Sequence, residues 1–196
     1  MKKQKEVRVD EIINAAVNEF LEKGFDNASM DNIAARASLS KGGLYHHFKS
    51  KSEILFTVNM KLTEPVLELF SMVEADRSVT HGLKTYIDNY LNFWNNNRKE
   101  LTLYFMTMNE SFSNTEIMNL YREMTRQTFD FFESQYIKGQ KTGLFRKIDA
   151  RAQAIALVSC LDGLLGYLLI DPSISIEKLS TGIKRSFIDN ILISHK

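Results

Sequence analysis

This 196-residue chain has little cysteine and proline and no large excess of either charge, and each of these features excludes a class of protein. Cys160 is the single cysteine, which excludes an intrachain disulfide framework and a cysteine-based metal cluster. Two prolines and nine glycines are too few for collagen-like or long disordered tracts. Basic and acidic residues nearly cancel, at 25 and 24, so any surface for nucleic acid must be locally basic. The lone cysteine fits a reducing setting, and we expect a cytoplasmic protein.

Signals for secretion or for a membrane are weak. The basic residues at the start of the chain are followed by charged residues instead of an apolar core, so we expect no secretory signal. The most apolar stretch, 152–170, is interrupted by Asp162 and contains Ser159 and two glycines. A membrane span needs ~20 apolar residues. We therefore expect this stretch to be a buried helix and expect no membrane partner.

Hydrophobic periodicity is helical along nearly the whole chain. Near the N-terminus, Ile12, Ala16 and Phe20 follow the four-residue step that places them on one helix face. No segment shows the sustained alternation of a strand, and the sequence has no internal repeat. The pattern therefore predicts an all-α fold.

Capping residues divide the first part of the chain into short helices. Gly24 is placed to end the first helix in a left-handed cap. Ser29 and Ser40 can cap the second and third helices. The sequence Ser-Lys-Ser-Glu at 50–53 is a capping box, which predicts the start of a fourth helix. We expect Pro65 to kink or break that helix, because it removes one helix hydrogen bond.

Longer apolar and aromatic helices follow. The pattern predicts helices through 83–94, 101–108, 117–132, 149–170 and 176–193. The segment 101–108 is apolar almost all round, so we expect it to be deeply buried. Because the composition shifts near residue 50, we predict two all-helical modules, 1–50 and 51–196, joined through the fourth helix without a flexible linker.

Two short helices of the first module have the spacing of a helix-turn-helix. They are predicted over 29–37 and 41–47, with a turn of about three residues between them. In that motif the second helix enters the DNA major groove.

The charge pattern of this region supports the same interpretation. Between residues 32 and 52 the charged residues are Arg36, Lys41, Lys49 and Lys51, with no acid. One edge of a nearly neutral module is therefore basic, as phosphate binding requires.

The segment 39–51 reads Leu-Ser-Lys-Gly-Gly-Leu-Tyr-His-His-Phe-Lys-Ser-Lys. It resembles the recognition segment of TetR-family regulators, whose pattern is approximately V-S-x-x-x-L-Y-x-H/Y-F-x-x-K. Gly24-Phe25 and Ser-Met-Asp-Asn-Ile-Ala at 29–34 match the family's preceding G-F/Y…T-x-x-x-I-A stretch. The close resemblance covers about residues 10–56. It implies an N-terminal three-helix DNA-binding module and a larger C-terminal helical module that binds a small molecule and dimerises.

The resemblance also implies DNA-contact roles. Tyr45 and His47 correspond to positions that contact phosphate or base edges, and Lys51 corresponds to a phosphate contact at the start of the fourth helix. Lys41 lies where a long donor can reach guanine. The predicted DNA-binding residues are Ser29, Arg36, Ser40, Lys41, Gly42, Gly43, Tyr45, His46, His47 and Lys51.

Several of these roles have alternatives. We expect Tyr45 to be exposed and not a core aromatic, because Leu44 and Phe48 already supply the inward positions. Arg36 either contacts phosphate or sits in a structural ion pair, and the sequence does not choose between the two. Ser29 is first a helix cap and second a phosphate ligand.

The sequence also departs from the family pattern. Ser38 stands where glycine is common in the turn, and Asp31 stands where a basic residue is frequent and would repel phosphate. Gly43 stands where threonine or alanine is common. Together with Gly42 it should weaken the short helix by about 2 kcal/mol relative to alanine. The two glycines also remove side chains that could read bases, so the operator sequence cannot be taken from relatives.

Aromatic and methionine side chains of the second module are candidate walls of an adaptable apolar pocket. Plain core is the alternative for an aromatic stripe at helical spacing. Glu110 either neutralises a cationic ligand or is a solvated helix end. The predicted ligand-binding residues are Phe70, Tyr90, Trp94, Tyr104, Phe105, Met108, Phe112, Tyr121, Met124 and Phe129.

The last two long helices are the predicted dimer helices, because their glycines allow another helix to approach closely. The predicted interface residues are Leu161, Gly163, Leu164, Gly166, Leu168 and Phe187, with intrachain core as the alternative for the leucines. A C2 dimer would pair two copies into a four-helix bundle. It would place two recognition helices ~34–36 Å apart, or a multiple of that. We expect Cys160 to be a buried apolar residue and not a redox sensor.

These patterns predict a transcriptional repressor that is released from a palindromic operator by a small apolar or amphipathic ligand. The predicted partners are operator DNA, that effector and a second copy of the chain, and no cofactor is predicted. An enzyme is not expected, because no Ser/His/Asp set, phosphate loop or metal-ligand cluster is evident. The main alternative is an interaction protein of the same architecture that acts through a protein partner.

Overall fold

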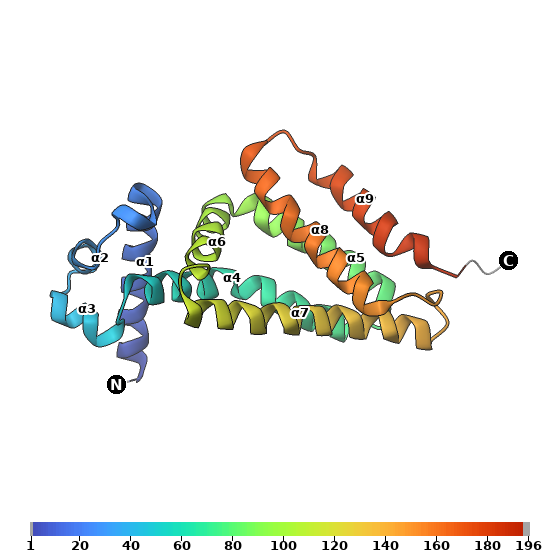
Figure 1. Cartoon of the computed structure of the whole chain (residues 1–196), viewed down its shortest axis with the longest axis horizontal. Coiled ribbons are helices and arrows are strands. Elements are labelled where there is room, and N and C mark those ends of the chain that lie inside the picture. The colour runs from blue at the N-terminus through green and yellow to red at the C-terminus, as the bar shows by residue number, and fades with distance from the viewer. Residues whose placement is uncertain (1, 194–196) are drawn as a thin grey trace. The chain divides into compact units, whose positions relative to one another are not determined.

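Helices account for nearly all regular structure in the computed structural model, which describes residues 2–193 and the side chains of 7–193. In chain order they are α1 (Lys2–Asn27), α2 (Met30–Arg36), α3 (Lys41–His47), α4 (Lys51–Ala75), α5 (Val79–Asn96), α6 (Arg98–Ser111), α7 (Thr115–Lys141), α8 (Ala150–Ile170) and α9 (Ile176–Phe187), followed by a 3-10 turn over Asp189–Ile191 (Figure 1). In this described part, β structure is limited to one isolated bridge, between Phe145 and Leu192. The predicted all-α fold is confirmed.

Side-chain caps begin the short helices where the sequence predicts them. The hydroxyls of Ser29 and Ser40 each accept a hydrogen bond from the backbone N–H three residues later, at 3.1 Å. At the start of α4, Ser50 Oγ accepts from the Glu53 N–H at 3.1 Å, and the Glu53 carboxylate accepts from the Lys49 N–H at 2.6 Å. These bonds satisfy backbone donors that have no partner inside a helix, and so they fix where each helix starts.

The helical backbone of α1 is interrupted at Gly24, with φ of +73°, where the sequence predicts the helix to end, and a further turn continues to Asn27. Two other helix boundaries differ from the expected ones. α4 runs through Pro65 as one helix, so the expected break is absent, because a proline removes only one helix hydrogen bond. The last helix ends at Phe187 and not at 193. The Phe187 carbonyl accepts side-chain hydrogen bonds from Tyr136 and Gln153.

The chain divides into two compact units. The first takes in the chain up to Glu64 together with Lys99–Met118, and the second takes in Pro65–Arg98 together with the chain from Asn119 onward. The unit that contains the short helices therefore extends past residue 50 and also includes nearly all of α6, which comes from the second half of the sequence.

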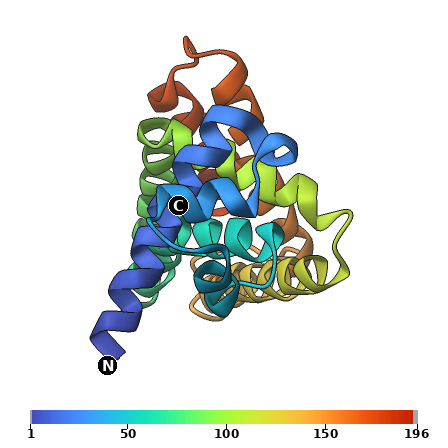
Figure 2. The ribbon, with the colours of Figure 1, turned by 90° about the vertical axis from the view of Figure 1, so that its left-hand side faces the viewer.

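In the first unit, α1, α2 and α3 lie side by side (Figures 1 and 2) and bury one apolar core. Ile12, Ala16 and Phe20 face this core from α1, as their spacing predicts. Leu44 joins it from α3 and Leu103 from α6, both fully buried. Because Leu44 anchors α3, its burial decides which side of that short helix faces solvent.

In the second unit, polar contacts hold α9 against α5. Asp88 on α5 accepts hydrogen bonds from Lys184 Nζ at 2.8 Å and from Ser180 Oγ at 2.5 Å, both on α9. Burial opposes ionisation of Asp88, but these donors keep the pKa of its carboxyl below the ordinary value. These contacts therefore hold α9 in a fixed position on α5.

Candidate functional site

The turn between α2 and α3 contains one strained residue. The Leu39 N–H donates to the Ala34 carbonyl at 2.8 Å and closes the end of α2. Ser38 has φ of +54°, in the left-handed region, where a residue other than glycine costs about 1–2 kcal/mol. This is the position where TetR-like sequences commonly have glycine, so Ser38 adopts a backbone that suits glycine better.

Because Leu44 points inward, the opposite side of α3 faces solvent. Tyr45 is 45% exposed, as predicted, and Lys41 and His46 are also exposed. Gly42 lies in open space, with no heavy atom within 4 Å of the place where a Cβ would stand. An ammonium, a phenol and an imidazole on one accessible surface can bond phosphate oxygens and base edges.

The other predicted DNA-binding residues on this motif are less accessible. A Cβ on Gly43 would lie 3.3 Å from Ser40 Oγ, so Gly43 faces the turn and not solvent. His47 is partly buried, and its ring meets that of His46 edge to face, with the centroids 5.5 Å apart. Ser29 and Ser40 both use their hydroxyl oxygens as caps. A DNA contact by any of them stays a prediction.

Arg36 is held by two carboxylates of α1. Its Nε donates to Glu19 at 2.7 Å, and its other nitrogens donate to Glu22. Glu19 is fully buried, and it also accepts from Asn32 Nδ2 and pairs with Lys23, both at 2.9 Å. Burial opposes ionisation of Glu19, but these hydrogen bonds outweigh it and hold the pKa of the carboxyl below its usual value. Of the two roles left open for Arg36, the structure shows the ion pair, which occupies the guanidinium.

Lys51 is turned back toward the protein. Its ammonium donates to the carbonyl oxygens of Phe25 at 2.6 Å, Ala28 at 3.1 Å and Asp26 at 3.3 Å. It also lies 4.3 Å from the centroid of the Phe25 ring, within cation–π distance. An ammonium has three N–H donors, and these three carbonyls match them. Lys51 therefore pins the start of α4 to the junction of α1 and α2, and the phosphate contact expected for it is not available while these bonds last.

Lys41 has an acidic partner on α2. Its Nζ lies 3.0 Å from Asp31 Oδ1 and 3.2 Å from Oδ2, and the side chains of Lys41 and Asp31 are 64% and 63% exposed. The hydrogen bond with Asp31 raises the pKa of Lys41. The acid that the sequence placed near the phosphate surface therefore contacts the first residue of α3.

The start of α4 is also tied to α6. Ser52 Oγ donates to Glu110 Oε1 at 2.6 Å. Leu103, two turns earlier on α6, lies in the core that also contains Leu44. Glu110 is thus neither a solvated helix end nor an acid without a partner. A polar and an apolar contact join α6 to the other helices of the first unit.

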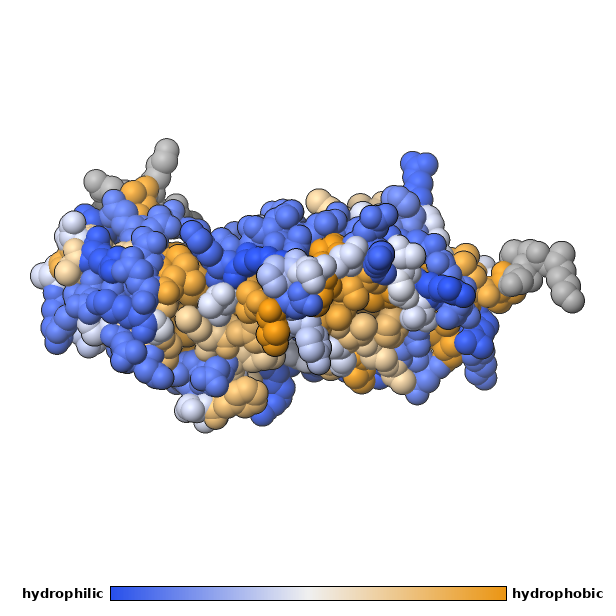
Figure 3. Space-filling view, turned by 90° about the horizontal axis from the view of Figure 1, so that it is seen from above, coloured by the Kyte–Doolittle hydropathy of each residue, from blue (hydrophilic) through white to orange (hydrophobic). Residues whose placement is uncertain are grey.

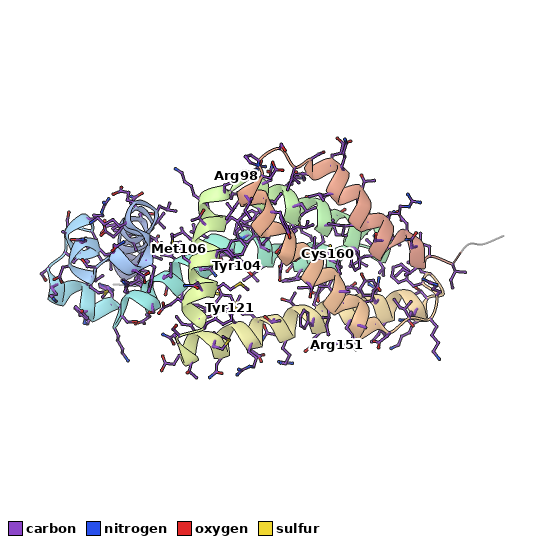
Figure 4. The ribbon with its side chains drawn as sticks, turned by 45° about the horizontal axis from the view of Figure 1, so that its top comes forward. Arg98, Tyr104, Met106, Tyr121, Arg151 and Cys160 are labelled. Atoms are coloured by element: carbon purple, nitrogen blue, oxygen red, sulfur yellow. The ribbon has the colours of Figure 1, made fainter. Side chains whose placement is uncertain are left out.

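The predicted ligand-binding residues are divided between the two units. Those in the first unit are Tyr104, Phe105, Met108 and Phe112, and those in the second are Phe70, Tyr90, Trp94, Tyr121, Met124 and Phe129. Figure 4 shows one from each unit, Tyr104 on α6 and Tyr121 on α7. Phe112 is 74% exposed and Trp94 is 2% exposed. Phe112 is thus a surface residue and Trp94 a core residue, and neither has the partial burial of a pocket wall.

Asp162 of the second unit has a feature that the sequence analysis missed. The Tyr90 hydroxyl donates to Asp162 Oδ1 at 2.7 Å, and the Tyr90 ring stacks on Tyr86. Burial raises the pKa of the Asp162 carboxyl, although the bond from Tyr90 lowers it. Among the described residues, no lysine, arginine or histidine forms an ion pair with it. The position of this acid inside the apolar run 152–170 is the sequence signal for such a buried contact.

α8 has an apolar face that its own chain does not cover. It is long and apolar enough to cross a membrane, yet only 33% of its most apolar window is buried. Ile155, Tyr167 and Ile170 are exposed, and Gly163 lies in open space. Figure 3 shows hydrophobic residues exposed among hydrophilic ones on one face of the molecule. The expected buried helix is therefore buried on one face only.

The predicted interface residues on α8 separate by helical period. Leu161 and Leu168 are 2% and 0% exposed, so the intrachain alternative holds for them and their place in an interface is corrected. Gly163 lies on the open face, and Leu164, Gly166 and Phe187 are half-buried. Successive residues of a helix point about 100° apart. Tyr167 and Ile170, one position before and two after Leu168, therefore lie on the outer face that the leucines were expected to supply.

Comparison with known proteins points to one family. The family described as "Bacterial regulatory proteins, tetR family" matches residues 12–58, which contain α2, α3 and the start of α4. The TetC protein of transposon Tn10 from Escherichia coli is 29% identical over 93 residues, and this match spans 46% of each chain, less than half of that relative. The negative transcriptional regulator IcaR of the biofilm operon icaADBC of Staphylococcus aureus is 26% identical over 67% of this chain and 73% of its own.

Solved structures share the fold over nearly the whole chain. SmeT, the repressor of a Stenotrophomonas maltophilia multidrug efflux pump, is 20% identical with a TM-score of 0.75 and covers 95% of this chain and 91% of its own. SmeT has also been solved as a complex with triclosan, with a TM-score of 0.77. At this identity the likeness shows the fold alone, including the helices outside the matched segment.

We predict that Lys51→Met lowers the free energy of unfolding by about 2 kcal/mol, because it leaves partly buried carbonyls without their charged donor. Urea unfolding followed by circular dichroism, without DNA, measures this loss. Lys49→Met, two residues earlier and exposed, is the control and should change stability by less than ~0.5 kcal/mol. Unchanged stability of Lys51→Met, with a loss of DNA affinity, would restore the phosphate-contact role.

We predict that Asp162→Asn raises the unfolding midpoint at pH 7, because it removes an acid whose pKa is higher in the folded state. The penalty exists only where the carboxyl is ionised, so the gain shrinks as pH falls and is absent below the ordinary aspartate pKa of ~3.9. Asp171→Asn at the end of the same helix is the control with the opposite sign. The hydrogen bonds of Ser173 lower the pKa of Asp171, so this variant loses stability at pH 7. A loss of stability at pH 7 for both variants would contradict the prediction.

Proposed function

We propose that this chain, a DNA-binding transcriptional regulator of the TetR family of bacterial regulatory proteins, is a repressor released from a palindromic operator by a small apolar or amphipathic effector. The observation that carries the DNA part is the solvent face of α3. There Leu44 anchors the helix, and Lys41, Tyr45 and His46 face outward.

We assign α3 to the major groove, with Lys41 and Tyr45 as its main contacts. The geometry of the short helix leaves these long side chains, with His46, as the donors that can reach a base edge or a phosphate. Arg36 and Lys51 act indirectly in this proposal, since both are bonded to the protein's own oxygens and hold α2 and α4 in place.

The proposed active form is a C2 dimer that pairs α8 and α9 of two copies. The exposed apolar face of α8 supports this, because such a face on a DNA-binding protein calls for a covering partner. A dimer also supplies the second recognition helix that a palindromic site needs. Ile155, Tyr167 and Ile170 would be the buried centre of this interface, with Gly163 allowing close approach.

Effector control would act through α6. This helix carries Tyr104, Phe105 and Met108, which are predicted ligand-binding residues, and it is also bonded to the first turn of α4 through Glu110 and Ser52. An effector that favours a different position of α6 would thus move the segment that follows α3. The effector must bind the two states with different affinity, or no shift occurs. Triclosan in SmeT is an example of a small hydrophobic ligand of a protein with this fold.

We predict that Tyr45→Ala weakens operator binding about 10-fold, equivalent to ~1.4 kcal/mol, because it removes the largest exposed group of α3. The operator is first obtained by selecting bound duplexes from a random pool, and affinity is then measured by fluorescence anisotropy. Phe112→Ala removes an even more exposed ring from the end of α6 and should leave affinity unchanged. Equal affinities for Tyr45→Ala and the wild type would remove Tyr45 from the interface.

We predict that Ile170→Glu raises the dimer dissociation constant at least ~100-fold, because an unpaired charge buried in an interface costs roughly 3–5 kcal/mol. Sedimentation velocity at micromolar concentration measures the shift to monomer, and affinity for the full palindrome should fall with it. Met72→Glu places the same charge on an exposed apolar residue of α4 and should leave the dimer intact. A monomeric wild-type protein would refute the dimer itself.

A further inference from the structure

The contact between Asp31 and Lys41 joins the two helices of the DNA-reading motif at the surface that is expected to meet DNA. Asp31 is the second residue of α2 and Lys41 the first of α3. The ammonium lies within 3.2 Å of both carboxylate oxygens, and both side chains are more than 60% exposed. The pair is therefore well formed and open to exchange with solvent or with another anion.

Lys41 matters because two of the other cations of this motif are already engaged. Arg36 is bonded to Glu19 and Glu22, and Lys51 is bonded to three backbone carbonyls. Lys41 is the one lysine of α3, whose remaining long polar side chains are a tyrosine and two histidines. Whether this ammonium contacts DNA therefore has a large effect on what α3 can bind.

The strength of the pair decides which DNA can take the ammonium from Asp31. An exposed ion pair contributes about 0.2–1 kcal/mol. One exposed phosphate offers Lys41 an interaction of the same kind, so the exchange gains little. A base edge with two acceptors, such as guanine O6 and N7, contributes about 1–3 kcal/mol of discrimination. Such an edge therefore outcompetes Asp31 where a phosphate does not.

We propose that Asp31 is an internal competitor of DNA for Lys41, which keeps Lys41 paired on non-operator DNA and yields it to a base edge in the operator. This inference rests on the DNA-binding function proposed above. The carboxylate acts as an internal substitute for a phosphate. Because the pair must break before Lys41 reaches a base edge, the carboxylate lowers operator affinity by the strength of the pair. On DNA of arbitrary sequence it withholds one phosphate contact, because Lys41 stays paired there.

The test is Asp31→Asn, which keeps the shape of the side chain and removes its charge. Affinities for the selected operator and for a random-sequence duplex of equal length are measured between about 50 and 200 mM salt, where screening of exposed charges increases with salt. We expect affinity for the random duplex to rise about 5-fold and its log–log salt slope to steepen by ~0.9, the value for one added phosphate contact. Operator affinity should also rise, by up to about 5-fold, because the pair no longer has to break, and its salt slope should stay the same, because Lys41 already contacts the operator in the wild type. An unchanged salt slope for the random duplex overturns the proposal.

Two further variants separate this mechanism from general charge repulsion. In a Lys41→Ala background, Asp31→Asn should have no effect on the random duplex, and a persistent 5-fold rise there would overturn the role of Lys41. Lys41→Ala alone should weaken the operator complex about 10-fold and leave the random duplex unchanged. This single variant tests the proposal even if Asp31→Asn folds poorly, and an equal loss on both duplexes counts against it.

Asp10→Asn is the matched control, because Asp10 forms an exposed pair with Lys61 that joins α1 to α4 and involves no residue of α2 or α3. It removes the same charge and should alter neither affinity. A wild-type protein that selects no sequence from a random pool would refute the proposed DNA-binding function. A wild-type protein that selects an operator, with Asp31→Asn indistinguishable from it, would refute only the role of Asp31.

Discussion

The buried carboxylate of Glu19 is the interaction on which the DNA-reading unit depends. A carboxylate removed from water costs several kcal/mol unless charged and hydrogen-bonding partners surround it. Asn32 and Arg36 supply such partners from the beginning and the end of α2, and Lys23 supplies a third from α1 itself. The acid thus fixes α2 on α1 at two points one turn apart. Because the turn that follows is short, the position of α3 follows from that of α2.

This arrangement uses cations that the sequence pattern assigns to DNA binding. The stretch 32–52 contains four cations and no acid, yet Arg36 serves Glu19, and Lys51 serves the carbonyls at the end of α1. A protein that makes fewer phosphate contacts binds DNA of arbitrary sequence more weakly and with a shallower salt dependence. The surface is therefore less basic in effect than the sequence pattern indicates, and it depends more on a few well-placed groups.

Local chemistry explains what could be predicted from the sequence. The caps at Ser29, Ser40 and Ser50 and the outward direction of Tyr45 depend on residues within four positions, where spacing and geometry decide the outcome. The partners of Arg36 and Lys51 lie 17 and 26 positions away, and such contacts depend on how helices pack. The same limit applies to α6, whose Leu103 joins the core of α1 and α3 although the composition places it in the second module. For α8, the sequence predicts the apolar character of the helix but not which of its faces is exposed. Nearly every position there is apolar, so the helical period alone does not identify the outer face.

The small number of base-reading side chains on α3 and the uncovered apolar face of α8 both favour the proposed dimer. Gly42 and Gly43 leave few side chains that can reach bases, and one good base contact provides about 1–3 kcal/mol of discrimination. Specific regulators discriminate by about 4–10 kcal/mol against other DNA. Contacts from Lys41 and Tyr45 of one copy give about 2–6 kcal/mol, which reaches only the lower part of that range. Two copies on a palindrome, as in the proposed dimer, use each contact twice, and the shape and deformability of the DNA between the half-sites add to them. For the proposed regulator, a recognition helix with so few reading groups thus makes the proposed dimer a source of specificity.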